Sequence, residues 1–409
     1  MAGVADKARF YLERSVPQLR EWEEKEIFSK DEIRSIVQRR SDFEHRVLAP
    51  GANPSEFSAY AAWEINLDAL RAKRCERLKI RHVASQHATQ ARVLAIYERA
   101  VGKRPACKEL WLEYLEYTAK IKATKRWRKT MTRALRLMPR DADLWVLAGQ
   151  KAADNGDMTS ARAYFMRGCR FCTADEVLWI EYARCEMQWL DKLERKKRKD
   201  GKKGGQNGQN GQKPAALAAE QVDESDEIQF NYDEDEADED GLILPESTVG
   251  KEAAPPVFDK KTEDALENNP AMDGAIPRAI FDVARKQPFY SDRVAERFFD
   301  LFAAFTAVSV QNKMLQHVFD AMVQEYEASP ATWSCYIRMP LVGVSPFSAA
   351  FPRGLREALS RLSKGLESTA DPAALRQNTV AWIDPVLALA DLDEGIRVVL
   401  EHTKGKLQA

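Results

Sequence analysis

The segment Trp111-Leu112-Glu113-Tyr114 returns in altered form as Trp145-Val146-Leu147-Ala148 and again as Trp179-Ile180-Glu181-Tyr182, so that the tryptophans lie 34 residues apart in both steps. Three arginines repeat with the same step: Arg99, Arg133 and Arg167. A period of this length is typical of stacked helical hairpins, because a single hairpin cannot bury its apolar face without a neighbour. The stretch from about residue 91 to residue 190 therefore predicts an all-α repeat scaffold and favours binding over catalysis.

The aromatic residues of these segments are spaced for burial inside the hairpins. A tryptophan and a tyrosine three residues apart fall on the same face of a helix. We expect this face to form the core of each hairpin rather than a ligand site. The predicted core residues are Tyr97, Trp111, Tyr114, Trp145, Phe165, Trp179 and Tyr182.

The fifty residues before the repeats predict two helices, over 6–28 and 30–48. Ser29 is a plausible N-cap of the second helix, and Glu32 three residues later completes a capping box. We expect residues 1–50 to cap the array. Leu12, Leu19, Trp22 and Phe28 exceed what a cap needs to bury, so they are candidates for a surface that contacts a partner protein.

Paired helices are expected along residues 51–194 and again along residues 275–409. The pairs in the first range are 55–80 with 87–101, 108–121 with 124–138, and 143–153 with 160–171. The pairs in the second range are 291–305 with 311–326, 331–338 with 354–362, and 372–389 with 394–403. A first helix over 176–193 has no partner close behind it.

Residues 195–274 differ in composition from the repeats on either side. They contain a basic run over 196–199, a Gly/Gln/Asn tract over 201–212 and an acidic run over 223–240. Such segments cannot bury enough apolar surface to fold, so we expect a long disordered insertion. The apolar segment 277–284 follows it and resembles the missing second helix. The insertion therefore interrupts a single repeat.

Charge is divided unevenly along a chain of 409 residues whose formal net charge is −1. Residues 1–199 hold 41 basic and 28 acidic side chains, a net of +13, whereas residues 200–409 hold 21 and 35, a net of −14. The basic excess is largest between Arg71 and Arg140, with 20 basic and 5 acidic residues. A basic half of this kind suggests contact with a polyanion.

The best nucleic-acid candidate within that region is the run Lys125-Arg126-Trp127-Arg128-Lys129, to which Arg104 and Arg140 would add charge. Cations of this kind grip phosphates, and an aromatic ring between them can stack on an unpaired base. The alternative is a solvated helix face with Trp127 buried in its hairpin, and we favour burial for the tryptophan. The acidic run 223–240 is either a solubilising loop or a motif that docks on a basic surface.

The sequence gives little support for a metal site, a catalytic site or a membrane-spanning segment. Cys169 and Cys172 form a single CxxC pair without the second pair that a zinc site needs, and His82 with His87 lacks an acidic companion. No phosphate-binding loop, nucleophile elbow or metalloprotease motif occurs. No apolar run is long enough to span a membrane, and the first residues lack a signal core. We expect an intracellular, non-enzymatic protein without cofactor or metal.

The repeats resemble a known helical family. The segments Tyr97-Glu98-Arg99-Ala100 and Ala161-Arg162-(x)-Tyr164-Phe165-(x)-Arg167 alternate with helices of the form Trp-x-x-Tyr at 111/114 and 179/182. This arrangement is similar to the half-a-TPR (HAT) repeat of RNA-processing proteins, although the repeat around Trp145 also fits a TPR unit. The resemblance implies a right-handed superhelical solenoid.

The N-terminal segment narrows the resemblance. It contains Arg9-Phe10-Tyr11-Leu12-Glu13, Pro17-Gln18-Leu19, Glu26-Ile27-Phe28-Ser29-Lys30-Asp31-Glu32-Ile33 and Arg40-(x)-(x)-Phe43-Glu44. This block looks like the opening of the U3 small nucleolar RNA-associated protein 6 family. The resemblance implies a nucleolar scaffold subunit of the UTP-B complex in the small-subunit processome, which acts beside β-propeller subunits in pre-18S ribosomal RNA processing. The alternatives are direct binding of RNA, such as U3 RNA or pre-ribosomal RNA, or a HAT scaffold of splicing or messenger-RNA 3′-end formation.

Overall fold

The computed structural model describes residues 2–203 and 273–408, and within these ranges every regular element is a helix. The prediction of an all-α protein is therefore confirmed for the described residues. By their internal contacts they form two compact units, which comprise residues 2–139 and residues 140–203 with 273–408. The division falls inside the range 51–194, for which the sequence suggested one block of repeats.

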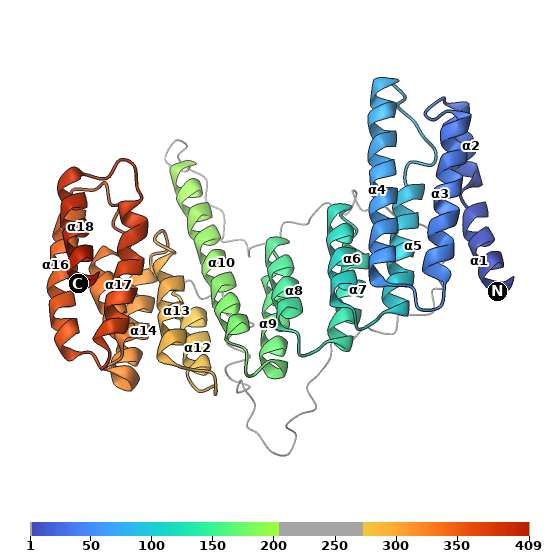
Figure 1. Ribbon diagram of the computed structural model, residues 1–409. Helices are drawn as coiled ribbons and strands as arrows, with labels where there is room; N and C mark the ends of the chain where they lie inside the picture. The colour runs from blue at the N-terminus through green and yellow to red at the C-terminus, as the bar shows by residue number, and fades with distance from the viewer. Residues whose placement is uncertain (1, 204–272, 409) are drawn as a thin grey trace, which may run out of the picture. The chain divides into compact units, whose positions relative to one another are not determined.

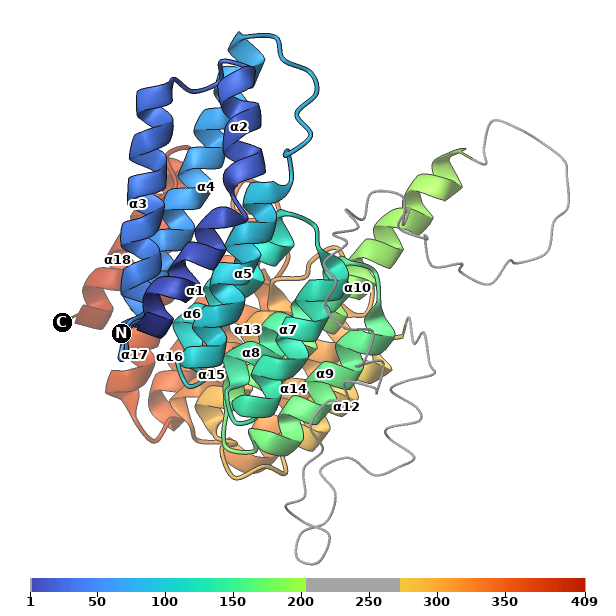
Figure 2. The same cartoon turned by 90° about the vertical axis from the view of Figure 1, so that its right-hand side faces the viewer.

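The first unit is a layer of N-terminal helices followed by two helix pairs (Figure 1). Its helices are α1 (Ala2–Glu13), α2 (Val16–Glu24), α3 (Lys30–Leu48), α4 (Pro54–Arg77), α5 (Ala88–Lys103), α6 (Lys108–Lys120) and α7 (Thr124–Leu137). The pairs are α4 with α5 and α6 with α7, and α6 also packs against α4 and α5. Helices α1 and α2 pack on α3, and Figure 2 shows α1 beside α3.

The single helix expected over 6–28 is wrong, because the structure divides this segment into α1 and α2. Proline at position 17 lies in the first turn of α2, where its missing N–H is tolerated, whereas inside a helix it would remove a backbone hydrogen bond. The hydroxyl of Ser15 donates to the carbonyl of Leu12 at 2.6 Å and closes the turn. The break lets the two short helices follow different parts of α3.

The capping box predicted at the start of α3 is confirmed. The backbone N–H of Ser29 donates to the Glu32 carboxylate at 2.9 Å, and the backbone N–H of Glu32 donates to the Ser29 hydroxyl at 3.3 Å. The same carboxylate accepts two hydrogen bonds from the Arg74 guanidinium on α4, at 2.7 and 2.8 Å. One glutamate therefore stabilises the start of α3 and fixes it to the end of α4.

The described residues of the second unit form five helix pairs. Its elements are α8 (Ala142–Asp154), α9 (Met158–Phe171), α10 (Glu176–Lys203), α12 (Ala275–Ala284), α13 (Asp292–Ala303), α14 (Gln311–Tyr326), α15 (Pro330–Arg338), the 3-10 turn η4 (Met339–Leu341), α16 (Phe351–Ser368), α17 (Pro372–Leu387) and α18 (Glu394–Gln408). The partners are α8 with α9, α10 with α12, α13 with α14, α15 with α16 and α17 with α18. The first helices also pack on one another, α8 on α10, α10 on α13, α13 on α15 and α15 on α17.

Helix α10 pairs with a helix that follows the undescribed residues in the sequence. It packs against α12, which contains the segment 277–284 that the sequence suggested as the missing second helix. Ile280, Phe281 and Ala284 of α12 are completely buried. The disordered insertion was predicted for residues 195–274, and its residues 204–272 lie outside the described ranges.

The start of that predicted insertion is wrong, because residues 195–203 continue α10. Ion pairs one helical turn apart support this extension: Arg195 with Asp191 and Arg198 with Glu194. The Glu194 carboxylate also accepts hydrogen bonds from the backbone and hydroxyl of Ser309, at 2.9 and 2.7 Å. A basic run without a core can therefore be helical when neighbouring carboxylates offset its charge.

An aromatic pair 17 residues apart joins successive helix pairs. The ring of a second helix lies 5.0–5.6 Å from a ring of the following first helix, at Phe43/Tyr60, Tyr97/Tyr114, Phe165/Tyr182, Phe281/Phe298 and Phe319/Tyr336. Because the pair recurs at Phe43/Tyr60, α3 packs on α4 as a second helix packs on the next repeat. At the boundary of the two units the corresponding sequence positions hold Met131 and Ala148.

Two glycines make room for the aromatic rings of the α8–α9 pair. A Cβ added at Gly149 would lie 2.4 Å from the ring of Phe165, and one added at Gly168 would lie 2.8 Å from the ring of Trp145. Neither glycine has a left-handed backbone, so the need is for close approach rather than for an unusual turn. The ring positions predicted from the sequence therefore depend on small residues opposite them.

Candidate interaction surfaces

The predicted core aromatics lie inside the two units. The least exposed are Tyr114, Trp145, Phe165 and Trp179, each with 0% of its surface exposed, and Trp111, Tyr182 and Tyr97 are also buried. In the first helix pair to carry the motif, the indole N–H of Trp111 donates to the carbonyl of Pro105 at 2.9 Å. These side chains hold the helices together and are not accessible to a ligand.

The prediction that N-terminal apolar residues form a surface for a partner protein is corrected, because most of these residues are buried in the first unit. Trp22, Leu19 and Phe28 are 0%, 6% and 3% exposed, and they form one apolar cluster with residues of α3 and α4. Leu12 is half-buried. The reason is that α4 is 24 residues long and its C-terminal part needs a cover, which α2 and the loop after it provide.

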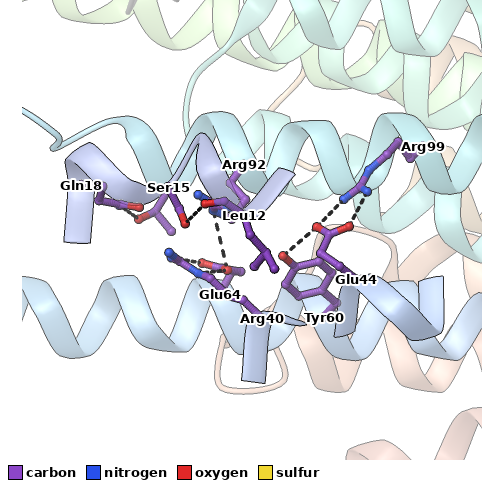
Figure 3. Close-up of polar contacts among 10 residues, drawn as sticks. Leu12, Ser15, Gln18, Arg40, Glu44, Tyr60, Glu64, Arg92 and Arg99 are labelled. Carbon is purple, nitrogen blue, oxygen red and sulfur yellow. Dashed lines mark hydrogen bonds and ion pairs between the residues drawn. The ribbon is translucent and has the colours of Figure 1, made fainter. Parts of the chain in front are cut away.

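Beneath these N-terminal helices lies a buried ionic network (Figure 3). The Arg40 guanidinium of α3 donates to both carboxylate oxygens of Glu64 on α4, at 2.7 and 2.9 Å, and both side chains are 0% exposed. Arg92 of α5 approaches the same carboxylate to 3.7 Å. If one of these helices moved away, a charge would remain buried without its partner, which is energetically costly. The ionic contacts therefore fix the relative positions of α3, α4 and α5.

A second part of the network surrounds Glu44, one turn after Arg40 on α3. Its carboxylate accepts hydrogen bonds from the Tyr60 hydroxyl at 3.0 Å and from the Arg99 guanidinium at 2.7 and 3.0 Å (Figure 3). Burial, followed by the nearby carboxylates, raises the pKa of Tyr60, so the phenol stays protonated and donates. The guanidinium of Arg99 also lies 4.2 Å from the ring centroid of Tyr11, which holds α1 against α5.

Polar contacts secure α2 to the start of α5 and to the loop before it. The Gln18 amide donates to the hydroxyl of Thr89 at 2.8 Å, a contact between two buried side chains. The Glu21 carboxylate accepts from the backbone N–H groups of Ala84 and Ser85, at 2.6 and 2.8 Å. Burial raises the pKa of Glu21, but the hydrogen bonds from Lys25 and Ser85 outweigh this effect and lower it to about 2.

The basic helix α7 presents part of its charge to solvent. Trp127 is 7% exposed and belongs to the hairpin core, as favoured from the sequence. Lys125, Arg128 and Lys129 are exposed, and none of them has a carboxylate partner among the residues that the structure describes. These three side chains form what we call the α7 basic face.

The other candidate RNA contacts are arranged differently. Arg126 is half-buried and its guanidinium lies 3.4 Å from the Tyr114 hydroxyl. Arg104 uses its guanidinium to donate to the carbonyl of Ala52 at 3.0 and 3.2 Å. Arg140 is exposed and belongs to the second unit. The structure therefore groups only the α7 basic face on one helix surface.

The cysteines of the second unit are buried thiols. Cys169, Cys172 and Cys185 are at most 6% exposed, and burial raises the pKa of Cys172 to about 11 and that of Cys185 to about 12. A nucleophile or metal ligand must be a thiolate, which such pKa values oppose. Within the described ranges no group of three or more His, Cys, Asp or Glu side chains could hold a metal ion. None of the described helices has the length and apolar character to cross a membrane.

A family model matches the N-terminal part of the chain. Residues 12–96 match the family model of U3 small nucleolar RNA-associated protein 6. These residues include the last two residues of α1, the helices α2 to α4, the first part of α5, and the buried ion pair of Arg40 with Glu64. The resemblance predicted from the N-terminal segment is thus confirmed over the matched residues.

Relatives with the same description come from distant eukaryotes. The U3 small nucleolar RNA-associated protein 6 of Schizosaccharomyces pombe is 37% identical over 193 residues, which are 46% of this chain and 40% of that protein. The human homolog is 28% identical over 188 residues, or 45% of this chain and 32% of that protein. The Dictyostelium discoideum homolog is 24% identical over 189 residues, covering 46% and 31%. The matched part spans less than half of each relative.

Proposed function

We propose that this chain is a non-catalytic scaffold subunit of a nucleolar pre-ribosomal complex that contains U3 RNA. The observation that carries the proposal is the match of residues 12–96 to the U3 small nucleolar RNA-associated protein 6 family. The proposed complex is UTP-B within the small-subunit processome, where the chain would act in pre-18S ribosomal RNA processing. The N-terminal match favours this role over a scaffold of splicing or messenger-RNA 3′-end formation.

The proposed architecture is a right-handed solenoid of HAT-type hairpins that holds other proteins, among them β-propeller subunits. Two features support it: first and second helices alternate within each unit, and the same aromatic pair joins successive pairs. A repeat array of this kind offers an extended surface for protein partners. No described cluster suggests a reaction that the chain would catalyse.

Affinity purification of the tagged chain tests the scaffold role. We expect U3 RNA and proteins of the early pre-ribosome to co-purify with the intact chain from nucleolar extract. Deleting residues 1–50 is a poor test, because Trp22 and Phe28 belong to the core of the first unit and their loss would unfold it. Co-purification of splicing or 3′-end processing factors without U3 RNA would contradict the proposal.

A second function, direct binding of RNA, is favoured by the α7 basic face. Its three cations have no described carboxylate partner, so phosphates could replace water around them without breaking an ion pair. The change Lys125→Glu with Arg128→Glu and Lys129→Glu should abolish salt-dependent binding of single-stranded RNA to the purified protein. Because these residues are exposed, the free energy of unfolding should change by less than about 0.5 kcal/mol.

The same triple variant separates the two functions. If the chain is a scaffold only, U3 RNA should co-purify with the variant as it does with the wild type. If the α7 basic face binds RNA directly, the purified variant should lose RNA affinity, and RNA affinity of the wild type should fall steeply as salt rises. Purified wild-type protein without measurable RNA affinity would exclude the second function.

A further inference from the structure

A cavity of about 600 Å³ lies on the first unit where α1, the end of α3, the start of α4 and the end of α5 meet. We call it the N-terminal groove. Its apolar wall contains Phe10, Val47, Leu48 and Phe57, and its polar lining consists of Asp6, Lys7, Tyr11, Arg99 and Lys103. It lies apart from the α7 basic face, whose residues are not among those that line it.

The groove exposes a large apolar side chain. The ring of Phe10 is 57% exposed, whereas Phe57 in the wall is 0% exposed. An exposed aromatic beside a buried apolar wall is typical of a surface that receives the bulky side chain of a partner. Gly102 leaves the groove open, because a Cβ added there would meet nothing within 4 Å.

The cations Lys7, Arg99 and Lys103 outnumber the one carboxylate, Asp6, among the residues that line the groove. The Lys103 ammonium donates to the carbonyl of Val47 at 2.6 Å, and neighbouring Arg104 donates to the carbonyl of Ala52. Neither cation forms an ion pair with a carboxylate of the described residues. Burial lowers the pKa of Lys103, and the like charges of Arg99, Arg104 and Lys7 lower it further. Arg99 differs, because Glu44 neutralises it.

We propose that the N-terminal groove binds an acidic peptide segment of a partner protein, with a bulky apolar side chain anchored beside Phe10 and Phe57. The anchor would fill the apolar wall, and flanking carboxylates would pair with Lys103 and Lys7. Charge complementarity selects an acidic peptide, and the largely apolar wall favours a peptide over a nucleic acid, which needs a row of cations. This inference deepens the proposed scaffold role by stating the chemistry of one partner.

The test uses the full chain and a fluorescein-labelled peptide in which glutamates flank one phenylalanine. Gly102→Leu fills the groove without changing charge, and Lys103→Glu reverses the charge at its rim. Each should weaken binding about tenfold or more, as expected for the loss of a central contact. Matched controls on the second unit are Gly405→Leu, at another open glycine, and Lys364→Glu, at another exposed lysine. Both should bind the peptide as the wild type does.

Further probes decide between occupants. A peptide with serine in place of phenylalanine should bind more weakly. The proposal is overturned if Gly102→Leu binds the peptide normally, or if single-stranded RNA binds in its place and is the ligand that Gly102→Leu excludes. It is also overturned if the peptide binds only after residues 223–240 are deleted, because the chain's own acidic run would then be the occupant.

A second variant tests the groove if the first does not fold, and one outcome separates the groove proposal from the scaffold proposal. If Gly102→Leu fails to fold by circular dichroism, Lys7→Glu combined with Lys103→Glu tests the same groove, since Lys7 is exposed. Failure of the purified wild-type chain to bind the acidic peptide, while U3 RNA still co-purifies with it, would reject the groove and leave the scaffold proposal intact.

Discussion

The contact of α3 with α4 in the first unit and the contact of α9 with α10 in the second unit are built on the same four residue types. In both, an arginine and a glutamate 24 positions apart form a bidentate buried ion pair, Arg40 with Glu64 and Arg162 with Glu186. The shorter N···O distance is 2.7 Å in each. A stacked aromatic pair lies beside each ion pair, at Phe43/Tyr60 and Phe165/Tyr182.

The two pairs differ in what surrounds them. In the first unit Arg92 approaches the same carboxylate, and Glu44 accepts the hydroxyl of Tyr60. In the second unit the position equivalent to Glu44 holds Met166, and the buried hydroxyl of Tyr182 has no hydrogen-bond partner among the described residues. Among the described residues, the same ion pair is therefore part of a network in the first unit and stands without further charged partners in the second.

This difference shows that the N-terminal segment is more than a cap. Helix α3 presents the arginine and the aromatic ring of a second helix, so residues 1–50 contribute a repeat-like helix to the array. The extra charges at Glu44, Arg92 and Arg99 hold α1, α4 and α5 around it (Figure 3). The signal was present in the sequence as the shared spacing of Arg40, Phe43, Tyr60 and Glu64 with their counterparts in the second unit.

The largest expected effect comes from removing one arginine of each ion pair. Arg162→Met leaves Glu186 buried without a cation and should lower the free energy of unfolding by about 3–5 kcal/mol. Arg40→Met should cost less, because Arg92 already lies 3.7 Å from Glu64. Urea denaturation measures both values, and hydrogen exchange assigns the loss to α9–α10 or α3–α4.

A double variant provides the control for that comparison. Arg162→Met with Glu186→Met replaces both charges by apolar groups and should recover most of the lost stability. Equal losses for Arg40→Met and Arg162→Met would show that Arg92 does not compensate, and the two sites would then be equivalent despite their different surroundings.

Removing the hydroxyl of Tyr60 or of Tyr182 should change the stability of the two units by different, smaller amounts. Tyr60→Phe removes a hydrogen bond to the Glu44 carboxylate and should cost about 1.5–3 kcal/mol. Tyr182→Phe removes a buried hydroxyl that has no hydrogen-bond partner in the described part of the chain, so the free energy of unfolding should be unchanged or higher. Thermal and urea unfolding of the two variants measure the contrast. A destabilised Tyr182→Phe variant would indicate a water or a side chain that satisfies this hydroxyl.

The smallest expected effect on stability comes from Glu21, whose carboxylate fixes α2 to the loop before α5. The folded-state pKa of Glu21 is about 2, below its ordinary value of 4.5. A lowered carboxyl pKa contributes stability that is fully present above pH 4.5 and is lost as the pH falls towards 2. Glu21→Gln should therefore cost about 1–2 kcal/mol at pH 7 and less at pH 3, measured by urea unfolding at both pH values. A gap that widens at pH 3 would contradict this assignment.

Much of the fold could be predicted because helical periodicity and capping are local. The spacing of Trp111, Trp145 and Trp179 predicted helices whose aromatic faces are buried, and the Ser29–Glu32 box predicted where α3 begins. Local signals did not predict the continuation of α10 to Lys203, since contacts with residues more than a hundred positions away help to hold it.

The candidate surfaces were harder to predict, because exposure depends on what lies opposite each side chain. Leu19, Trp22 and Phe28 have the composition of a partner surface, yet the length of α4 makes them core. The N-terminal groove joins residues of α1, α3, α4 and α5, which no sequence pattern places together.

The sequence by itself therefore determined most of the helices, their pairing order and the aromatic faces, because these follow from periodicity over a few turns. Only the tertiary structure decided which charges are buried as pairs and which are left at the surface. Arg40 and Lys103 are both cations on helices, but Glu64 neutralises the first in the core, whereas the second donates to a carbonyl at the edge of a groove. That distinction depends on long-range packing, which sets the partners and the solvation of each charge.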